Sequence, residues 1–285
     1  MESLALRRVL PYTANSPIRT TKTSVRGQGG GAMPRTVAVA NQKGGVGKTT
    51  TAVNLAAALA MAQRRVLLID LDPQGNAGSG LGYPGVKVTR GIYDVLTSHA
   101  TLREVLMETE VPGLSLVPSG QRLVGAEVEL VGVDRREYRL KDALREIEGD
   151  FDFILIDAPP SLGFLTINAL TAARSVLVPV QCEYYALEGL SHLLGAIRLV
   201  QQGLNPELQI EGVLLTMYDN RLNLSQQVLE ETRRFFAERV YRTVIPRNVR
   251  LSEAPSFGKP VVIYDPQCVG ATSYVNLARE VLERG

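Results

Sequence analysis

Short apolar runs alternate with longer segments of helical apolar spacing along most of this chain. A short apolar run bounded by polar residues is typical of a buried strand, and apolar positions three and four apart are typical of a helix. The pattern predicts strands at residues 37–40, 65–70, 114–118, 153–157, 175–180, 211–217 and 240–245. It predicts the main helices at residues 51–62, 91–106, 134–148, 184–202 and 224–239.

Strands that alternate with helices predict an α/β fold with a doubly wound, mainly parallel sheet flanked by helices. Residues 65–70 read R-V-L-L-I-D. Such a nearly continuous apolar run is expected for a parallel strand that is covered on both faces. A chain of 285 residues with 45% hydrophobic content is long enough for one such domain with a substantial core. We therefore expect residues 33–285 to form a single domain.

Residues 1–32 differ in character from the rest of the chain. They are polar and basic, and they end in a glycine-rich stretch. A segment of this composition buries too little apolar surface to order itself, so we expect a disordered basic tail. Its charge fits either a solvated tail or non-specific contact with DNA. Met33 stands directly before the first predicted strand and is an alternative start, which would leave the tail untranslated.

The nearly balanced charge of the chain excludes a strong overall electrostatic field of one sign. The chain carries 31 basic and 29 acidic residues, for a net charge of only +2. Any binding of nucleic acid must therefore come from a local basic patch. The chain has no apolar run long enough to span a membrane, and its N-terminus lacks the apolar core of a secretory signal. We therefore expect a cytoplasmic protein.

The cysteines and histidines offer no metal-binding pattern. Cys182 and Cys268 lie far apart without paired spacing, which argues against a disulfide scaffold, a zinc site or an iron–sulfur cluster. We expect two buried thiols. His99 and His192 have no partner at ligand spacing, so we expect structural roles for both.

The most informative stretch is residues 38–51, which read A-V-A-N-Q-K-G-G-V-G-K-T-T-T. A predicted strand leads into a glycine-rich loop and then into a helix, as in a phosphate-binding loop, where backbone N–H groups and the helix N-terminus bind phosphate. We expect Lys48 to reach the β- and γ-phosphates and the Thr49 hydroxyl to bind Mg²⁺. The alternative is a glycine-rich turn that binds nothing. The predicted nucleotide contacts are Lys43, Gly44, Gly45, Val46, Gly47, Lys48, Thr49 and Thr50.

Two predicted strands end in aspartates at the edge where open α/β sheets bind ligands. One strand delivers Asp70 and Asp72, and the other ends at Asp157. Asp157 stands in a Walker B position, so we expect it to hold Mg²⁺, through a water molecule. The alternatives are a strand-capping role for Asp157 without an ion and a turn or helix-capping role for Asp72.

The loop departs from the usual P-loop pattern, because Gln42 replaces a glycine and Lys43 adds a second lysine. In this it resembles the deviant Walker A group of P-loop ATPases, whose motif reads K-G-G-x-G-K-[ST]. Over residues 34–285 the chain resembles the ParA-type (Soj-like) chromosome-partitioning ATPases in particular. The sequence segments that carry this resemblance are D-L-D-P-Q-G-N-A, D-A-P-P-S, P-V-Q-C-E-Y-Y-A-L-E-G, T-M-Y-D and I-P-R-N-V-R-L-S-E-A-P-S-F-G-K-P.

The resemblance implies an ATPase whose ATP-bound form is a sandwich homodimer that binds double-stranded DNA without sequence preference. A ParB-type centromere-binding protein stimulates its weak hydrolysis of ATP to ADP and phosphate, after which the subunits leave the DNA. The resemblance also implies that Lys43 contacts the nucleotide of the partner subunit, that Asp72 orients the attacking water and that Thr50 contacts the α-phosphate. The implied adenine contacts are Met217, Pro246 and Asn248.

For DNA, the resemblance implies two arginines on one face of the dimer, and the matching positions are Arg221 and Arg250. Arg247 and Lys259 would widen this patch. Such contacts neutralise phosphates, so binding should weaken steeply with salt and ignore sequence. The alternative is that these exposed side chains only solvate a surface.

The alternative function is that of a ParA-like ATPase that positions another cargo, or of a MinD-like ATPase at the membrane. A membrane role calls for a basic amphipathic helix at the C-terminus. Residues 275–285 instead mix both charges and carry no aromatic anchor. We expect this segment to pack on the fold, with no membrane contact, and the protein to associate with the nucleoid.

Overall fold

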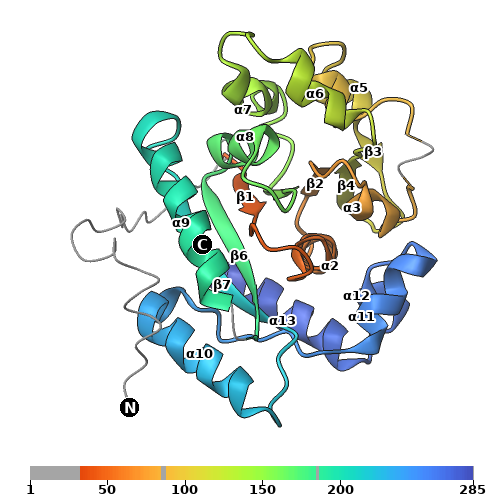
Figure 1. The fold of residues 1–285 in the computed structure, drawn as a ribbon. Coiled ribbons are helices and arrows are strands. Elements are labelled where there is room, and N and C mark those ends of the chain that lie inside the picture. The colour runs from red at the N-terminus through yellow and green to blue at the C-terminus, as the bar shows by residue number, and fades with distance from the viewer. Residues whose placement is uncertain (1–32, 85–87, 184–185, 285) are drawn as a thin grey trace.

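The computed structural model describes residues 33–84, 88–183 and 186–284 (Figure 1). The predicted disordered tail lies outside these residues. Within them, a seven-stranded sheet runs in the order β3-β4-β2-β5-β1-β6-β7, and every neighbouring pair is parallel except β3 and β4. This confirms the predicted mainly parallel sheet. The strands are β1 (Arg35–Val39), β2 (Val66–Asp70), β3 (Met107–Glu108), β4 (Leu114–Val117), β5 (Phe153–Asp157), β6 (Ser175–Gln181) and β7 (Gln209–Thr216).

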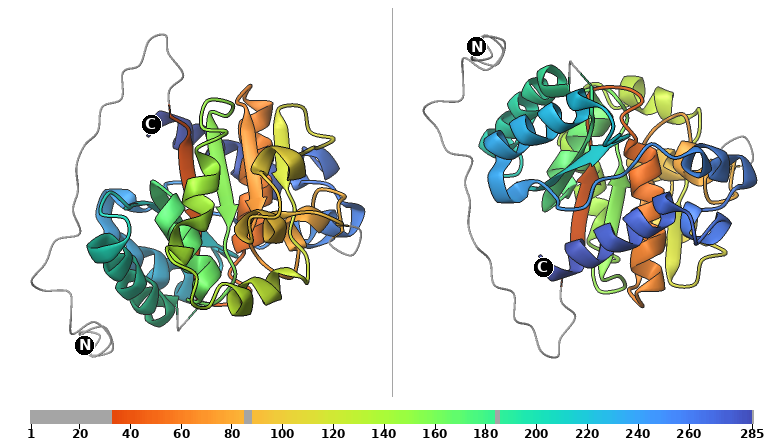
Figure 2. Two further views of the ribbon diagram at one scale, coloured as in Figure 1. Left: turned by 90° about the horizontal axis from the view of Figure 1, so that it is seen from above. Right: turned by 90° about the horizontal axis from the view of Figure 1, so that it is seen from below.

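Helices cover both faces of the sheet, as Figure 2 shows from two sides. The face with the N-terminal helix carries α2 (Lys48–Met61), α3 (Asn76–Ser79), α12 (Val261–Tyr264) and α13 (Val269–Glu283). The opposite face carries α4 (Ile92–Leu96), α5 (Leu102–Val105), α6 (Leu123–Glu129), α7 (Arg139–Leu144), α8 (Phe164–Ala172), α9 (Ala186–Gly203) and α10 (Asn223–Phe236). The remaining helical segments are η2 (Arg136–Tyr138), η3 (Ala237–Arg239), α11 (Val249–Glu253) and η4 (Ala254–Phe257).

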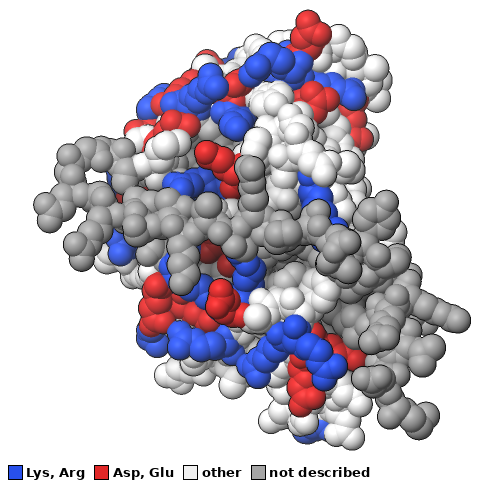
Figure 3. All heavy atoms as spheres, turned by 90° about the vertical axis from the view of Figure 1, so that its left-hand side faces the viewer, with Lys and Arg blue, Asp and Glu red and all other residues white. Residues whose placement is uncertain are grey.

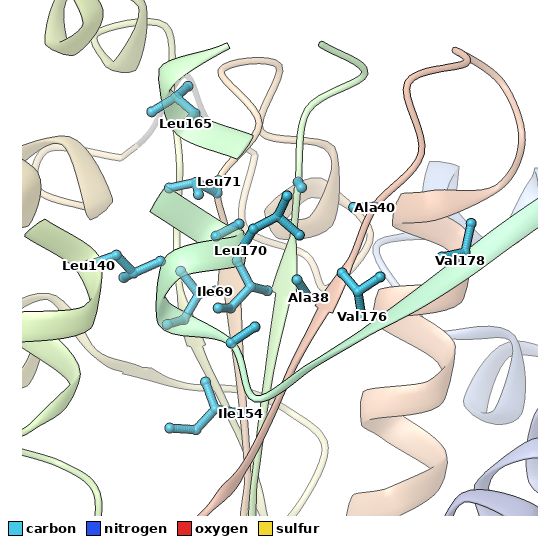
Figure 4. Packing of buried hydrophobic residues seen from close by; sticks show 14 of the residues in the cluster. Ala38, Ala40, Ile69, Leu71, Leu140, Ile154, Leu165, Leu170, Val176 and Val178 are labelled. Atoms are coloured by element: carbon cyan, nitrogen blue, oxygen red, sulfur yellow. The ribbon is translucent and has the colours of Figure 1, made fainter. Parts of the chain in front are cut away.

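Alternation along the strands builds a separate core on each face. Successive side chains of a strand point to opposite sides of the sheet. Val37 and Val39 of β1 therefore pack toward α2 and α13, whereas Ala38 and Ala40, which directly follows the strand, face the other layer. Figure 4 shows Ala38 and Ala40 among the labelled members of that second cluster. Both faces of the central strands are buried, which explains their nearly continuous apolar sequences.

The C-terminal helix packs on the fold, as expected from its sequence. Leu277, Ala278 and Val281 of α13 are buried in the same cluster as the inner face of α2. The hydroxyls of Tyr274 and Thr51 lie within hydrogen-bond distance, at 3.2 Å, and join the two helices. None of the helices in the described part of the chain combines the length and apolar character that a membrane span requires.

The predicted strand at residues 240–245 is wrong. In its place an irregular segment contacts β7 through an isolated bridge between Val213 and Val240. The N–H groups of Tyr241 and Ile245 donate to β7, but two donors between them find another partner. The N–H groups of Arg242 and Thr243 donate to the two carboxylate oxygens of Glu280 on α13, at 2.8 and 3.0 Å. These two donors are therefore not available to a strand ladder.

Two predicted helices are interrupted. The segment at residues 91–106 divides into α4 and α5, because Ser98 takes a left-handed conformation with φ of 62° and Thr101 then caps α5. The segment at residues 134–148 divides into η2 and the short α7. The pattern also missed the short elements β3, α3, α6, α8, α11 and α12, and it gave no helix range for the longer α13.

Both cysteines are free thiols, but only one is fully buried. Burial raises the pKa of Cys182 to about 12, which makes it unreactive. Cys268 is half-buried, and its sulfur accepts a hydrogen bond from the Ala271 N–H at the start of α13. Neither feature points to redox chemistry.

Candidate functional site

The glycine-rich loop connects the end of β1 to the start of α2, and β1 lies between β5 and β6 in the sheet. Gly45 and Gly47 have φ values of 75° and 86°, a region that other residues enter only with strain. Open space surrounds the positions that side chains at Gly44 and Gly45 would occupy. The loop therefore offers its backbone without obstruction, as phosphate binding requires.

Hydrogen bonds from two other strands hold this loop. The Asn41 side-chain amide donates to the Pro179 carbonyl on β6 at 2.7 Å, and its oxygen accepts from the Lys43 N–H at 3.0 Å. The Thr216 hydroxyl at the end of β7 donates to the Val46 carbonyl at 2.8 Å. Sequence reasoning missed Asn41 and Thr216, because nothing local in the sequence shows that β6 and β7 lie beside the loop.

Lys48 is buried at the first turn of α2, and its ammonium donates to the Lys43 carbonyl at 3.1 Å. Burial lowers the pKa of Lys48, and the carboxylates of Asp157 and Asp72 oppose that effect. Thr49 and Thr50 follow in the same turn and are half-buried. The loop lysine and the two predicted acidic residues are therefore close enough to interact electrostatically.

Asp157 and Asp70 end neighbouring strands and are partners in the register of β2 and β5. Both side chains are fully buried. Burial, together with the Asp70 charge, raises the pKa of Asp157 well above its usual value. Within the described residues neither oxygen of the Asp157 carboxylate receives a hydrogen bond of ordinary geometry, although the nearby Thr49 hydroxyl works against the rise in pKa.

This unpartnered carboxylate fits a cation. Mg²⁺ usually binds through one or two protein oxygens and completes its shell with water and phosphate. Asp157 and Thr49 supply such a pair. The described residues contain no cluster of three or more acidic, cysteine or histidine side chains that would hold a metal alone. Asp157 and Thr49 therefore fit a Mg²⁺ ion that completes its shell with phosphate and water, and their contact with the ion stays a prediction.

Asp70 has a structural role that the sequence did not predict. Its carboxylate accepts hydrogen bonds from the N–H groups of Asp72, Ala77 and Gly78, at 3.0 to 3.1 Å. Burial nevertheless raises the pKa of Asp70 to about 7. Asp70 thus shapes the turn that follows β2 and fixes the position of Asp72.

Asp72 lies at the same edge and is mostly buried. One of its carboxylate oxygens accepts from the Gln74 N–H at 2.9 Å, so the residue stabilises the turn as well. The Asp72 carboxylate can stabilise this turn and still interact with Lys48, because a carboxylate has several acceptor positions.

The residues predicted to enclose adenine come from two adjacent loops. Met217, with φ of 51°, follows β7, and the next residue bridges to Pro246. Asn248 follows in the second loop, and its side-chain oxygen accepts from the Arg250 N–H at 2.9 Å and caps α11. The structure brings the two loops together, and their contact with adenine stays a prediction.

Of the four predicted DNA residues, Arg221 and Arg247 lie in the same two loops, Arg250 lies in α11 and Lys259 follows η4. Arg221 and Arg247 line one hollow of about 480 Å³ beside Tyr218 and Pro246. Arg221 pairs with Asp219 at 2.7 Å. Lys259 follows η4, and its N–H donates to the Ala254 carbonyl.

Arg250 pairs with Glu253 at 2.8 Å and with Asp265 at 3.1 Å. Both arginines thus carry acidic partners in the free chain. Figure 3 likewise shows acidic and basic side chains intermingled on one face of the molecule. Any DNA contact must therefore compete with these intramolecular pairs.

Lys43 forms an ion pair with a residue from a distant part of the chain. Its ammonium contacts the Glu183 carboxylate, which stands just after β6. Both side chains are about one-third exposed, at 34% and 35%. Sequence reasoning did not single out Glu183.

Comparisons with known proteins agree with this geometry. A family model described as an AAA domain matches residues 34–210. The chain is 57% identical over 260 residues to the chromosome partitioning protein ParA of Myxococcus xanthus, covering 91% of this chain and 92% of that protein. It is also 57% identical over 253 residues to the sporulation initiation inhibitor protein Soj of Bacillus subtilis, covering 89% of this chain and all (100%) of that protein.

Solved structures show the same fold with nucleotide. A crystal structure of cobyrinic acid a,c-diamide synthase from Mycobacterium smegmatis, with bound ADP and magnesium, superposes with a TM-score of 0.78 at 41% identity. The match covers 88% of this chain and 95% of that chain. The fold is that of P-loop nucleotide-binding proteins.

Proposed function

Because this chain belongs to the ParA/Soj family of chromosome-partitioning ATPases, we propose that it hydrolyses ATP to partition a chromosome. The observation that carries the proposal is the glycine-rich loop beside Asp157, a buried carboxylate without a hydrogen-bond partner in the described residues. The protein would work in the cytoplasm, on the nucleoid.

The loop binds the phosphates of ATP. Backbone N–H groups from Gly44 to Thr49 surround them, and the start of α2 adds its partial positive charge. Lys48 leaves its resting contact with the Lys43 carbonyl and turns to the β- and γ-phosphates. Thr50 contacts the α-phosphate. Met217, Pro246 and Asn248 enclose the adenine.

Asp157 and Thr49 hold Mg²⁺ when it is bound, which neutralises charge on the phosphate oxygens. The raised pKa of Asp157 fits this role, because a buried carboxylate whose oxygens receive no hydrogen bond is costly. Binding of the cation would remove that cost.

Hydrolysis is phosphoryl transfer, so the protein contributes positioning and charge neutralisation. Asp72 holds the attacking water at the γ-phosphate through the carboxylate oxygen that the turn leaves free. Asp70 keeps the turn in place through its three hydrogen bonds.

ATP also joins two subunits. Lys43 of each chain reaches the nucleotide of the other, so ATP binds the dimer better than the monomer and shifts the equilibrium toward it. Removal of the γ-phosphate weakens this contact and releases the subunits. A ParB-type partner would accelerate a weak intrinsic hydrolysis.

The ATP-bound dimer would bind double-stranded DNA without sequence preference. Arg221 and Arg250 contact phosphates, and Arg247 and Lys259 widen the patch. Doubling the patch by dimerisation raises the number of phosphate contacts, which explains why a chain with a net charge of only +2 would bind DNA in one state alone.

The Asp72→Ala variant tests the proposal. We expect it to bind ATP and dimerise yet lose turnover, because the water loses its partner while the three hydrogen bonds to Asp70 keep the turn in place. A matched Asp134→Ala variant changes an exposed acid away from the site and should hydrolyse ATP like the wild type. Normal turnover in Asp72→Ala would remove that residue from the mechanism, and absence of ATP binding by the wild type would refute the proposal.

A further inference from the structure

Lys43 of the free chain is already engaged, and its partner lies within the same subunit. The ammonium of Lys43 pairs with the carboxylate of Glu183. The proposed function, on which this inference rests, requires the same ammonium to contact a nucleotide held by another copy. A lysine ammonium that pairs with Glu183 in the monomer must leave it before it can serve the partner subunit.

Both ends of this ion pair stand on fixed backbone. The Lys43 N–H binds Asn41, whose amide binds the Pro179 carbonyl on β6. Glu183 lies two residues beyond the end of β6, and the N–H of the preceding residue, Cys182, donates to the Thr216 carbonyl at 3.1 Å. The Thr216 hydroxyl in turn holds the loop at Val46.

The pair therefore differs from the surface pairs of the two arginines. Arg221 pairs with an acid two residues away, and one partner of Arg250 lies in its own helix. Lys43 and Glu183 are 140 residues apart in sequence, and strand pairing brings them together. Such a contact is a product of the fold and constrains the lysine at the mouth of the phosphate loop.

We propose that Glu183 is a positioning residue for Lys43 and holds its ammonium within the subunit until an ATP-bound second copy replaces the contact. An interaction that exists only in the monomer opposes dimerisation by its own strength. A partly exposed ion pair is weak, so the effect is a modification of the dimerisation equilibrium and leaves the chain able to dimerise.

The test is the dimer dissociation constant of the full chain, measured by sedimentation velocity with ATPγS and Mg²⁺. We expect Glu183→Gln to lower this constant by a factor of about two to thirty, because dimerisation breaks one partly exposed ion pair in each of the two subunits. The gain should shrink in high salt, because the lost pair is electrostatic. The protein concentration for half-maximal ATPase activity should fall in parallel.

Two controls separate positioning from a general effect of charge. Glu283→Gln removes an acid on α13 that pairs with Arg242, and it should leave the dissociation constant unchanged. Glu183→Gln in a Lys43→Ala background should match Lys43→Ala alone. An equal or weaker dimer in Glu183→Gln, or an effect that persists without Lys43, would overturn the inference.

Failure of the proposed function gives a different result. In that case the wild type does not dimerise with nucleotide, or Lys43→Ala dimerises as well as the wild type. If the wild type dimerises, Lys43→Ala is impaired and Glu183→Gln equals the wild type, only the role of Glu183 is wrong.

Discussion

Two buried carboxylates at the ends of neighbouring strands make this fold sensitive to pH. Asp70 has a pKa of about 7 against a usual value of 3.8, and the pKa of Asp157 is raised as well, chiefly because both are buried. A group whose pKa rises on folding binds protons more readily in the folded state. Without Mg²⁺, these groups should therefore lower the stability of the chain as the pH rises from about 4 to 7.

The Asp157→Asn variant tests this consequence. Its amide removes one of two adjacent buried charges, so we expect the free energy of unfolding at pH 8 without Mg²⁺ to increase, by about 0.5–3 kcal/mol as is typical of a single substitution. Denaturant unfolding at pH 5 and pH 8 measures it, with Asp134→Asn as the control. The variant should also lose the stabilisation that ATP and Mg²⁺ give the wild type. An unchanged pH dependence would contradict the account.

The ion pair of Arg221 gives a second test at this scale. The Arg221 guanidinium holds the pKa of Asp219 at about 2, below the usual 3.8. In Arg221→Gln we expect the pKa of Asp219 to return toward its usual value, because the charged partner is gone. An NMR titration of the carboxylate measures this, with Arg279→Gln as the control. A pKa that stays near 2 would show that another group controls Asp219.

Among the elements, α13 supports the segment that leads to the predicted adenine and DNA residues. Glu280 is buried and accepts two backbone N–H groups, those of Arg242 and Thr243. Although burial opposes it, these hydrogen bonds lower the pKa of Glu280. Its contribution to stability is therefore present above its usual pKa of 4.5 and is lost as the pH falls below it.

Glu280→Ala should destabilise the chain by about 2–4 kcal/mol, because two part-buried N–H donors lose their acceptor. Glu283→Ala on the same helix is the matched control, since its carboxylate is 55% exposed, and should change stability by less than about 0.5 kcal/mol. Thermal or denaturant unfolding measures both variants. Equal stabilities would mean that water satisfies the two N–H groups.

The same contact shows where prediction from sequence ends. The strands that carry Asp70 and Asp157 were predictable, because their apolar runs are local. Residues 240–245 have the same local pattern but do not form a strand. The N–H groups of Arg242 and Thr243 bind Glu280, and no local signal in the sequence connects that helix to this segment.

Across the whole molecule, the glycine loop, its lysines and the Walker B aspartate were predictable, because each belongs to a contiguous sequence motif. The supports of the loop could not be. Asn41 reaches a carbonyl 138 residues away, and Thr216 reaches one 170 residues away. Such contacts exist only once the strand order is known, and so does the pairing of Lys43 with Glu183.

The proposed DNA face depends on charges that are partly neutralised in the free chain. Arg250→Glu should weaken DNA binding by the ATP-bound protein at least about tenfold and lower its salt dependence, because a phosphate contact is lost. Arg279→Glu changes the net charge equally from α13 and should have little effect. Filter binding at several salt concentrations measures both. An unaffected Arg250→Glu would mean that this arginine only solvates the surface.

The central claim is that ATP switches this protein onto DNA. Co-sedimentation with non-specific duplex DNA tests it most directly, with ATP and Mg²⁺, with ADP, and without nucleotide, at two salt concentrations. We expect binding with ATP alone and its loss at the higher salt, since phosphate contacts release counterions. Absence of DNA binding in every state, with ATP-dependent dimerisation intact, would contradict the account and favour an ATPase that positions another cargo.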